Sequence, residues 1–515
     1  IQHYCTKDQV RESWVDDFRI YGVGGLTDSF LATMDTKLTS EVLTVEGASV
    51  SGYAGMTAQQ LLDAVAVSSG ASKKVLTPDG KSEVGSGTLA EKGMIIQVTS
   101  PDGSSRKNYV LDIADAVIGD IQYKSNGVMT NGKFAVGTFE ASVEVDSYVT
   151  SGIPLALVVA QYENDRLINI SVEEANITQK GISKLTATMN VTKSEGTTMS
   201  IMLLDGLATI RPLKKSINLT PFSSAAIETV TKLYPGYVNK AVTLSFDDLN
   251  PVQDGKFIEI LNKNGLKATF NLKTSNFIKQ SESVQQSYVK MYQGHELANH
   301  TRNHLRLYET NTESADYQTL QTCKDEILNG QNDIKSRFGV TPEGLVWPFT
   351  SPRNRTDYAE LIEYIRSLGI KYIRPVDTTN GFNLPSDWYD WRASCHHDGA
   401  NNLVDRFLAL PDEGGEVDDL KLFYIWGHTY EFDETHKPEE TNKLRWDDIE
   451  ALCKKLGDAN IWSATNLEVY NYVEALKKIE IDTSTNRVTN PTDVDVYIQI
   501  NGINTMVPAH GVAGL

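Results

Sequence analysis

The stretch AVTLSFDDLNPVQDGKFIEILNKNGLKATFNLKT, residues 241–274, decides the architecture of the longest region of the chain. An apolar strand ends in two aspartates, a helix follows, and a second strand comes after it. The same alternation of strand and helix continues for about 250 residues. Alternating units of this kind predict parallel strands with helices between them, so we expect residues 225–480 to close into a (β/α) barrel.

The sequence predicts smaller modules in the remainder of the chain. Residues 1–42 show no assignable pattern. Residues 43–118 alternate in short strands between glycine turns and predict a small β-rich module, with one helix at 57–65 capped by Thr57 and one hairpin turning at Pro101, Asp102 and Gly103. Residues 119–217 contain strand-length runs at regular spacing and predict a β-sandwich. A spacer role or a sugar-binding role stays open for both of these modules. Residues 481–515 predict a small β element.

The length and net charge of the chain exclude some classes of binding partner. With 515 residues the chain is too long for one core, and its net charge of −19 repels phosphate backbones and anionic membranes. A neutral polymer such as a polysaccharide remains open. No apolar run reaches about 18 residues, so we expect no membrane span. The chain begins without methionine, so we expect a mature secreted form. Its four cysteines are scattered without a CxxC pair and give no zinc-ribbon signal.

The segment HELANHTRNH, residues 295–304, concentrates three of the nine histidines. His300 and His304 are four apart, so one helical turn would place both imidazoles on one side. Together with Asp248 they would form a three-ligand site, open at one position, of the kind that suits zinc and similar ions. Two surface histidines and a helix-capping aspartate are the alternative. His295 is an odd number of residues from His300, so we expect a structural role for it.

Two further strand ends carry candidate residues. His428 follows the apolar strand FYIW and a glycine, where it is either a general acid facing the metal or a buried core residue. In LVWPF, residues 345–349, the side chains of Trp347, Pro348 and Phe349 form either a wall of a substrate groove or ordinary packing.

SFDD, HTRNH and WGH, in this order, resemble the polysaccharide deacetylases of the fourth carbohydrate esterase family, and the stretch WGHTYEFD resembles a divergent subgroup of it. The resemblance covers about residues 238–480. It implies a distorted (β/α) barrel that removes acetyl groups from polysaccharides with a divalent metal, most simply zinc, with cobalt, nickel or manganese as alternatives.

The resemblance also implies roles for single residues. Asp247 matches the family's catalytic base, and His428 matches its general acid. Asp248, His300 and His304 match its metal ligands.

The chain departs from the family pattern at the third motif. The family usually carries an arginine two residues before the motif's proline, where it orients the base, and this chain has Val346 there. Arg353 and Arg355 are the nearby arginines that could reach back.

Later motifs give weaker candidates. DWYDW, residues 387–391, resembles the fourth motif, which helps to hold the late histidine and makes Asp390 and Trp391 candidates. His396 and His397 in CHHD either contact substrate or are exposed loop residues.

The sequence therefore predicts a secreted or cell-surface, bacterial-type deacetylase that acts on an acetylated polysaccharide. The intact aspartate pair, the histidine pair and the late histidine favour this enzyme. The missing arginine favours the alternative, an inactive carbohydrate-binding or cell-surface protein on the same scaffold. N-acetyl and O-acetyl substrates are not separable, because the same attack of water on a carbonyl serves both.

Overall fold

The computed structural model describes residues 36–40, 43–51, 56–111, 116–147, 152–440 and 443–515. By its internal contacts the chain separates into two units, which are Ile1–Gly127 with Ala135–Thr220, and Val128–Phe134 with Pro221–Leu515. Of the predicted segment 1–42, only residues 36–40 lie within the described part. The predicted boundaries between modules stay predictions.

The described amino-terminal residues of the first unit form a five-stranded sheet of order β2-β3-β7-β6-β5, a β1–β4 strand pair and the short helix α2. Helix α2 (Ala58–Asp63) begins after Thr57, whose side chain accepts the Gln60 N–H while the Gln60 side chain accepts the Thr57 N–H. The predicted cap and helix are therefore confirmed, as is the hairpin, formed by two antiparallel strands. The strands are β1 (Leu38–Thr39), β2 (Thr44–Glu46), β3 (Ser49–Ser51), β4 (Ala66–Val67), β5 (Ser72–Leu76), β6 (Ile95–Thr99) and β7 (Arg106–Leu111).

The rest of the first unit is described as antiparallel strands, of which β12, β13, β14 and β15 are 11 or 12 residues long. β12 pairs with β15, while β13 lies between β14 and β16. Apolar side chains alternate along β12, where Phe139, Ala141, Val143 and Val145 are all buried. The strand-length runs predicted from sequence are confirmed as strands. Their bounds are β8 (Ala116–Ile118), β9 (Gln122–Ser125), β12 (Gly137–Ser147), β13 (Ile153–Glu163), β14 (Arg166–Ile177), β15 (Gly181–Val191), β16 (Thr197–Leu204) and β17 (Ile217–Pro221).

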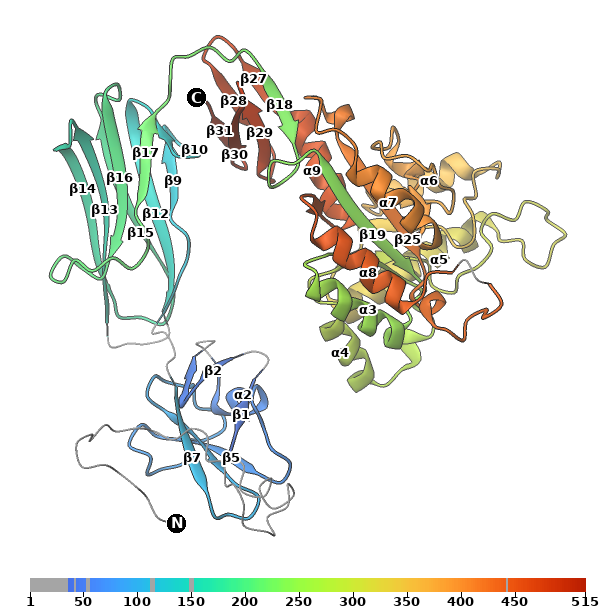
Figure 1. The fold of residues 1–515 in the computed structure, drawn as a ribbon, viewed down its shortest axis with the longest axis horizontal. Coiled ribbons are helices and arrows are strands. Elements are labelled where there is room, and N and C mark those ends of the chain that lie inside the picture. Colours follow the sequence, from blue (N-terminus) through green and yellow to red (C-terminus); the bar gives the residue numbers. More distant parts are fainter. Residues whose placement is uncertain (1–35, 41–42, 52–55, 112–115, 148–151, 441–442) are drawn as a thin grey trace. The chain divides into compact units, whose positions relative to one another are not determined.

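The second unit is built on a parallel sheet of order β23-β22-β21-β20-β19-β25-β24, with β26 pairing β19 as well. Figure 1 labels the paired strands β19 and β25 of this sheet among the helices of the unit. Every residue of β19 is buried, as expected for a strand covered on both faces. The strands are β19 (Lys240–Asp247), β20 (Thr269–Leu272), β21 (Glu296–Asn299), β22 (Gly344–Val346), β23 (Tyr372–Arg374), β24 (Cys395–His396), β25 (Lys421–Gly427) and β26 (Trp462–Ser463).

The predicted closure of the barrel is wrong at one place. Among the described strands, β23 and β24 end the sheet and do not pair with each other. The chain between them forms loops and the short 3-10 helix η2 (Trp388–Asp390) in place of a strand, so no backbone ladder links the two edges. The result is an open, distorted barrel.

Helices connect the strands of this sheet, and their starts follow local capping. Helix α5 begins at Leu320, because the Thr319 side chain accepts the Thr322 N–H and caps the helix there. Helix α7 was not predicted. The helices are α3 (Pro251–Lys263), α4 (Glu282–Met291), α5 (Leu320–Phe338), α6 (Tyr358–Ser367), α7 (Ala400–Leu408), α8 (Trp446–Gly457) and α9 (Asn466–Lys478). None of the described helices is long and apolar enough to cross a membrane.

The carboxyl-terminal strands pack against the barrel through α9. The Tyr472 hydroxyl donates to the Leu233 carbonyl at 2.5 Å and accepts the Tyr497 N–H at 2.9 Å, while Val496 and Ile498 are fully buried beside it. The remaining strands of the unit are β10 (Val128–Thr130), β11 (Lys133–Phe134), β18 (Val230–Leu233), β27 (Glu480–Asp482), β28 (Arg487–Asn490), β29 (Val496–Ile500), β30 (Ile503–Val507) and β31 (Gly511–Ala513).

Candidate metal centre and active site

The candidate residues gather where the parallel strands end. Asp247 is the last residue of β19, His300 follows β21, Arg374 is the last residue of β23, and His428 follows β25. Because the carboxyl ends of parallel strands meet at one edge, side chains from distant parts of the sequence converge there.

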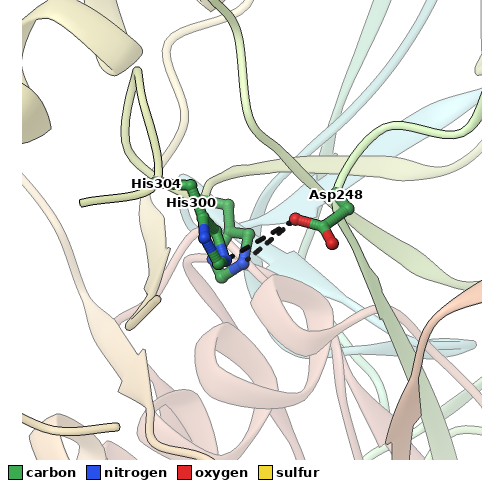
Figure 2. Close-up of side chains that lie close together, drawn as sticks. All are labelled: Asp248, His300 and His304. Carbon is green, nitrogen blue, oxygen red and sulfur yellow. Dashed lines mark ion pairs between the residues drawn. The ribbon is translucent and has the colours of Figure 1, made fainter. Parts of the chain in front are cut away.

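The three predicted metal ligands come together. Asp248 Oδ1 lies 3.8 Å from His300 Nε2 and 3.6 Å from His304 Nε2 (Figure 2). Both separations are too long for hydrogen bonds, and the buried Asp248 Oδ1 has no hydrogen-bond partner in the described part of the chain. Two ligands on one tetrahedral zinc ion are about 3.3 Å apart, given metal–ligand bonds of about 2.0–2.1 Å. The donors and their spacing therefore fit a divalent metal ion.

The backbone around these ligands differs from the predicted helical turn. Residues 300–304 form no helix, and Thr301 and His304 adopt positive φ angles of 62° and 58°. The backbone of Asp248 also has a positive φ angle, of 88°. The Asn299 side chain accepts the Thr301 N–H at 2.9 Å, and the Thr301 hydroxyl accepts the His304 N–H at 3.2 Å. These bonds hold a strained conformation of the kind that is concentrated at functional sites.

Neighbouring groups fix the two imidazoles. His300 Nδ1 lies 3.0 Å from the Val346 carbonyl, which can only accept, so Nδ1 carries the proton and Nε2 offers its lone pair to the metal position. Burial lowers the pKa of His300 despite the nearby carboxylates. Burial likewise lowers the pKa of His304 to about 4. Both histidines are therefore neutral near pH 7, as metal ligation requires.

Asp247 is a buried carboxylate clamped by an arginine. Arg374 Nη2 donates to both carboxylate oxygens, at 2.7 and 2.5 Å, and the Asn271 amide donates to Oδ1 at 2.7 Å. Burial alone would raise the pKa of Asp247, but the positive charge of Arg374 and the nearby His300 and His428 outweigh it and leave the pKa lowered. Arg374 is 1% exposed, so this ion pair is shielded from solvent.

The arginine that holds the base was not identified from the sequence. Of the two expected candidates, Arg353 pairs with Asp377, and Arg355 is bound by Asp357 at 2.8 Å. Neither reaches the base, and Arg374 on the neighbouring strand β23 takes that position. One signal in the sequence could have identified it. Arg374 ends the apolar strand KYIR, and a buried arginine needs a partner of opposite charge.

His428 faces both carboxylate groups of the site. Its Nδ1 lies 3.3 Å from Glu431 Oε2, and its Nε2 lies 3.9 Å from Asp248 Oδ2. Burial would lower the pKa of His428, but the hydrogen bond to Glu431 and the charges of Asp247 and Asp248 raise it. Glu431 was not predicted either, although its position three residues after His428 places it within reach.

The residues of the LVWPF stretch divide between core and surface. Trp347 and Pro348 are buried, and Trp347 belongs to a core cluster with Leu345. Phe349 is 45% exposed, and its ring lies 4.5 Å from that of His304, centroid to centroid. Only Phe349 is thus placed to form a wall beside the metal ligands.

The two fourth-motif candidates lie apart from the late histidine. Asp390 pairs with Arg392 at 2.7 Å, and Trp391 is 1% exposed in the core. Among the described contacts of His428, the carboxylate partner from its own segment is Glu431.

Of the two alternatives for His396 and His397, the one that makes them exposed loop residues is wrong. His396 is partly buried and His397 is completely buried. His396 Nε2 lies 3.0 Å from Glu431 Oε2, so both histidines belong to the surroundings of His428. Pairing of β24 with β25, which the sequence did not predict, brings them there.

His295 is not one of the grouped metal ligands and immediately precedes β21. Its Nδ1 accepts the Ala268 N–H at 3.2 Å, and its ring packs edge-on against Phe270. Burial lowers the pKa of His295 to about 4, so the neutral form is the one that packs here.

Comparison with known proteins places this region in a family. The family model described as polysaccharide deacetylase matches residues 237–373. No curated protein matches the chain.

Solved structures similar to this chain include a family 4 carbohydrate esterase from Streptomyces lividans in complex with acetate (19% identity, 49% of this chain and 99% of that chain, TM-score 0.28). They also include a peptidoglycan deacetylase from Bacillus subtilis (18%, 48% and 92%, TM-score 0.28) and a family 4 pseudoenzyme from Bacillus anthracis (13%, 49% and 73%, TM-score 0.29).

Proposed function

Because residues 237–373 belong to the polysaccharide deacetylase family, we propose that this chain removes acetyl groups from an acetylated polysaccharide by metal-dependent hydrolysis. One observation carries the proposal. A buried, arginine-clamped carboxylate, Asp247, directly precedes the aspartate of a three-ligand group that fits a divalent ion.

Asp248, His300 and His304 would hold the ion. Two imidazole nitrogens and one carboxylate oxygen suit zinc best, with cobalt, nickel or manganese as alternatives. When bound, such an ion polarises the acetyl carbonyl and lowers the pKa of a bound water.

Asp247 acts as the general base and takes a proton from the attacking water. Arg374 contributes in two ways. Its charge keeps the buried carboxylate ionised near neutral pH, and its two hydrogen bonds fix the direction of that carboxylate. The role that the family's third-motif arginine plays is thereby assigned to a residue on a different strand, and Val346 contributes its backbone carbonyl to His300.

His428 acts as the general acid and protonates the departing amine or alkoxide as the bond to the acetyl carbon breaks. Glu431 accepts a hydrogen bond from Nδ1, which turns Nε2 towards the metal ligands. The raised pKa of His428 favours the protonated form that an acid needs.

The exposed ring of Phe349 provides an apolar wall beside His304 for a sugar ring. Arg306 lies 5.1 Å above Phe349, and Tyr308 meets it edge-on, so the wall continues into this loop. We extend the proposal to both N-acetyl and O-acetyl groups, since the same residues serve either leaving group. A polymeric substrate of this kind supports a secreted or cell-surface location.

An inactive carbohydrate-binding protein was the competing interpretation, and Val346 was the residue that favoured it. With Arg374 clamping the base, that reason no longer applies.

Two variants of the full chain test the proposal. Asp247→Asn should abolish acetate release from acetylated glycans while the metal content stays at the wild-type level. His304→Ala should lose the metal together with activity. Asp390→Asn, which removes a carboxylate paired with the exposed Arg392, is the control and should behave like wild type. Unchanged turnover in Asp247→Asn would remove it from the role of base, and retained metal in His304→Ala would contradict the ligand set.

A further inference from the structure

Lys273 directly follows strand β20, whose four residues are all buried. In the parallel sheet β20 lies between β19 and β21, and the carboxyl ends of those two strands are followed by the proposed metal ligands. Because the three strands run in the same direction, the end of β20 lies at the same edge of the sheet. The sheet therefore places a lysine between the two strand ends that supply the ligands.

The ammonium group of Lys273 faces the ligand group without a hydrogen bond to it. Lys273 Nζ lies 3.5 Å from Asp248 Oδ1, the oxygen that the two ligand histidines also approach, and this oxygen has no hydrogen-bond partner among the described residues. A lysine that neutralises a carboxylate comes closer, as Lys443 does to Asp398 at 2.6 Å. The N–H donors of Lys273 are therefore not used by this carboxylate.

The backbone beside Lys273 is fixed to the loop that carries the ligand histidines. The Ser275 N–H donates to the carbonyl of Arg302, which lies between the two histidines in the sequence, at 2.9 Å. The Lys273 side chain is 27% exposed, and those of Asp248 and His304 are also partly exposed. The ammonium group is thus held at a part of the ligand group that solvent, and therefore a substrate, can reach.

The site has an excess of positive charge when a divalent ion is bound. The Asp248 carboxylate cancels one charge of the ion, ligand histidines are neutral, and Asp247 is already paired with Arg374. Lys273 adds a further positive charge at short range. Like charges this close repel each other unless an anion lies between them. The arrangement therefore favours an anion that forms at the site during the reaction.

We propose that Lys273 is a further catalytic residue, which donates a hydrogen bond to the acetyl carbonyl oxygen as that oxygen becomes negatively charged. This role rests on the deacetylation proposed for the same site. The bond between the water oxygen and the carbonyl carbon forms while Asp247 takes the water proton, and the π electron pair of the carbonyl moves to its oxygen. Lys273 stabilises this oxyanion and keeps its own proton. The electron pair then re-forms the carbonyl as the bond to the leaving amine or alkoxide breaks and His428 protonates the leaving group.

The kinetics of acetate release from glycans, measured on the full chain loaded with zinc, test this role. Lys273→Met keeps a similar length but removes the charge and the donors, so kcat should fall about 100- to 1000-fold with KM nearly unchanged. Lys273→Arg keeps a positive charge and should recover part of the loss. Lys263→Met, which removes an exposed lysine paired with Glu450, is the matched control and should behave like wild type. Wild-type kcat in Lys273→Met would overturn the role, and so would a rise in KM alone, which indicates a residue that only binds substrate.

The zinc affinity of Lys273→Met gives a readout that does not depend on turnover. Measured by competition with a chelator, it should equal or exceed the wild-type affinity, because a positive charge beside the ion has been removed. Loss of the ion in this variant would show that Lys273 holds the ligand group together and would overturn the catalytic role. Lys273→Gln, which also lacks the charge, serves in these measurements if Lys273→Met does not fold.

Acetate binding separates a failure of this role from a failure of the proposed function. Acetate is the product of the proposed reaction and also presents a negatively charged oxygen, so by calorimetry it should bind zinc-loaded Lys273→Met about 10-fold more weakly than the zinc-loaded wild type. Equal acetate affinity in the two proteins would overturn the role of Lys273 alone. A wild-type chain that releases no acetate from glycans, but whose acetate affinity depends on Lys273, would instead contradict the proposed function.

Discussion

Replacing Arg374 by methionine is the sharpest perturbation of the proposed chemistry. Methionine keeps most of the volume of the side chain but removes its charge and both hydrogen bonds to Asp247. The carboxylate would stay in place, 4% exposed, with the Asn271 amide as its remaining hydrogen-bond donor among the described side chains. Burial then dominates, and the pKa of Asp247 rises.

The size of the effect follows from the burial of the pair. Removing one partner of a buried ion pair costs about 3–5 kcal/mol. At about 1.4 kcal/mol per pH unit, that energy would raise the pKa of Asp247 by roughly 2–4 pH units. Because the pKa of Asp247 starts below its ordinary value, this rise would reduce the ionised fraction near pH 7 by less than about tenfold. Lost alignment of the base adds to it, so we expect a total fall of about 100-fold, of which only the part due to ionisation should recover as the pH rises.

The assay is acetate release as a function of pH, with metal content measured on the same preparation. In Arg374→Met the acidic limb of the pH profile should shift to higher pH, while the metal content stays at the wild-type level. Arg353→Met, which removes an arginine paired with Asp377 and not with the base, is the control and should leave the profile unchanged. A normal profile and normal turnover in Arg374→Met would refute the assignment of Arg374 as the residue that holds the base.

Three further outcomes are expected. His428→Asn should slow acetate release from glycans by about 100- to 10,000-fold but affect an activated aryl acetate far less, because a phenoxide leaves without protonation; equal losses on both substrates would contradict an acid role. Phe349→Ala should raise KM roughly 3- to 10-fold with kcat nearly unchanged, and a pure kcat effect would exclude a binding wall. The pKa of His295, lowered to about 4 in the fold, gives stability that is present above pH 6.5 and lost as the pH falls towards 4. Urea unfolding should therefore show a loss of about 1–2 kcal/mol between pH 7 and 5 that is absent in His295→Gln.

Local patterns in the sequence were enough to predict most strands and helices of the barrel and the convergence of the ligands. SFDD ends a strand that is buried along its whole length, and such a strand can lie only inside a sheet covered on both sides. Because parallel strands present their carboxyl ends together, Asp248 and the histidines after β21 were expected to meet, and they do.

The predictions that failed for Arg374 and His397 concern contacts between segments that are distant in the sequence. Arg374 lies 127 residues after Asp247, and only the pairing of β22 with β23 shows that its side chain reaches the base. His397 looked exposed because β24 is two residues long and carries no periodic pattern. Its burial depends on Gly427 in the adjacent strand.

The helical turn expected between His300 and His304 failed for a local reason. The spacing of four residues suits a helix, but the Asn299 side chain accepts the Thr301 N–H and supports a left-handed residue there. Side chains that compete for the backbone N–H groups override the spacing.

The most direct test of the central claim is the metal content of the purified full chain, measured together with acetate release from a panel of N- and O-acetylated glycans before and after chelation. The account predicts a bound divalent ion and acetate release that stops on chelation and returns when zinc is restored. A chain that binds no ion after incubation with zinc or cobalt would contradict it, because Asp248, His300 and His304 would then hold no metal at all.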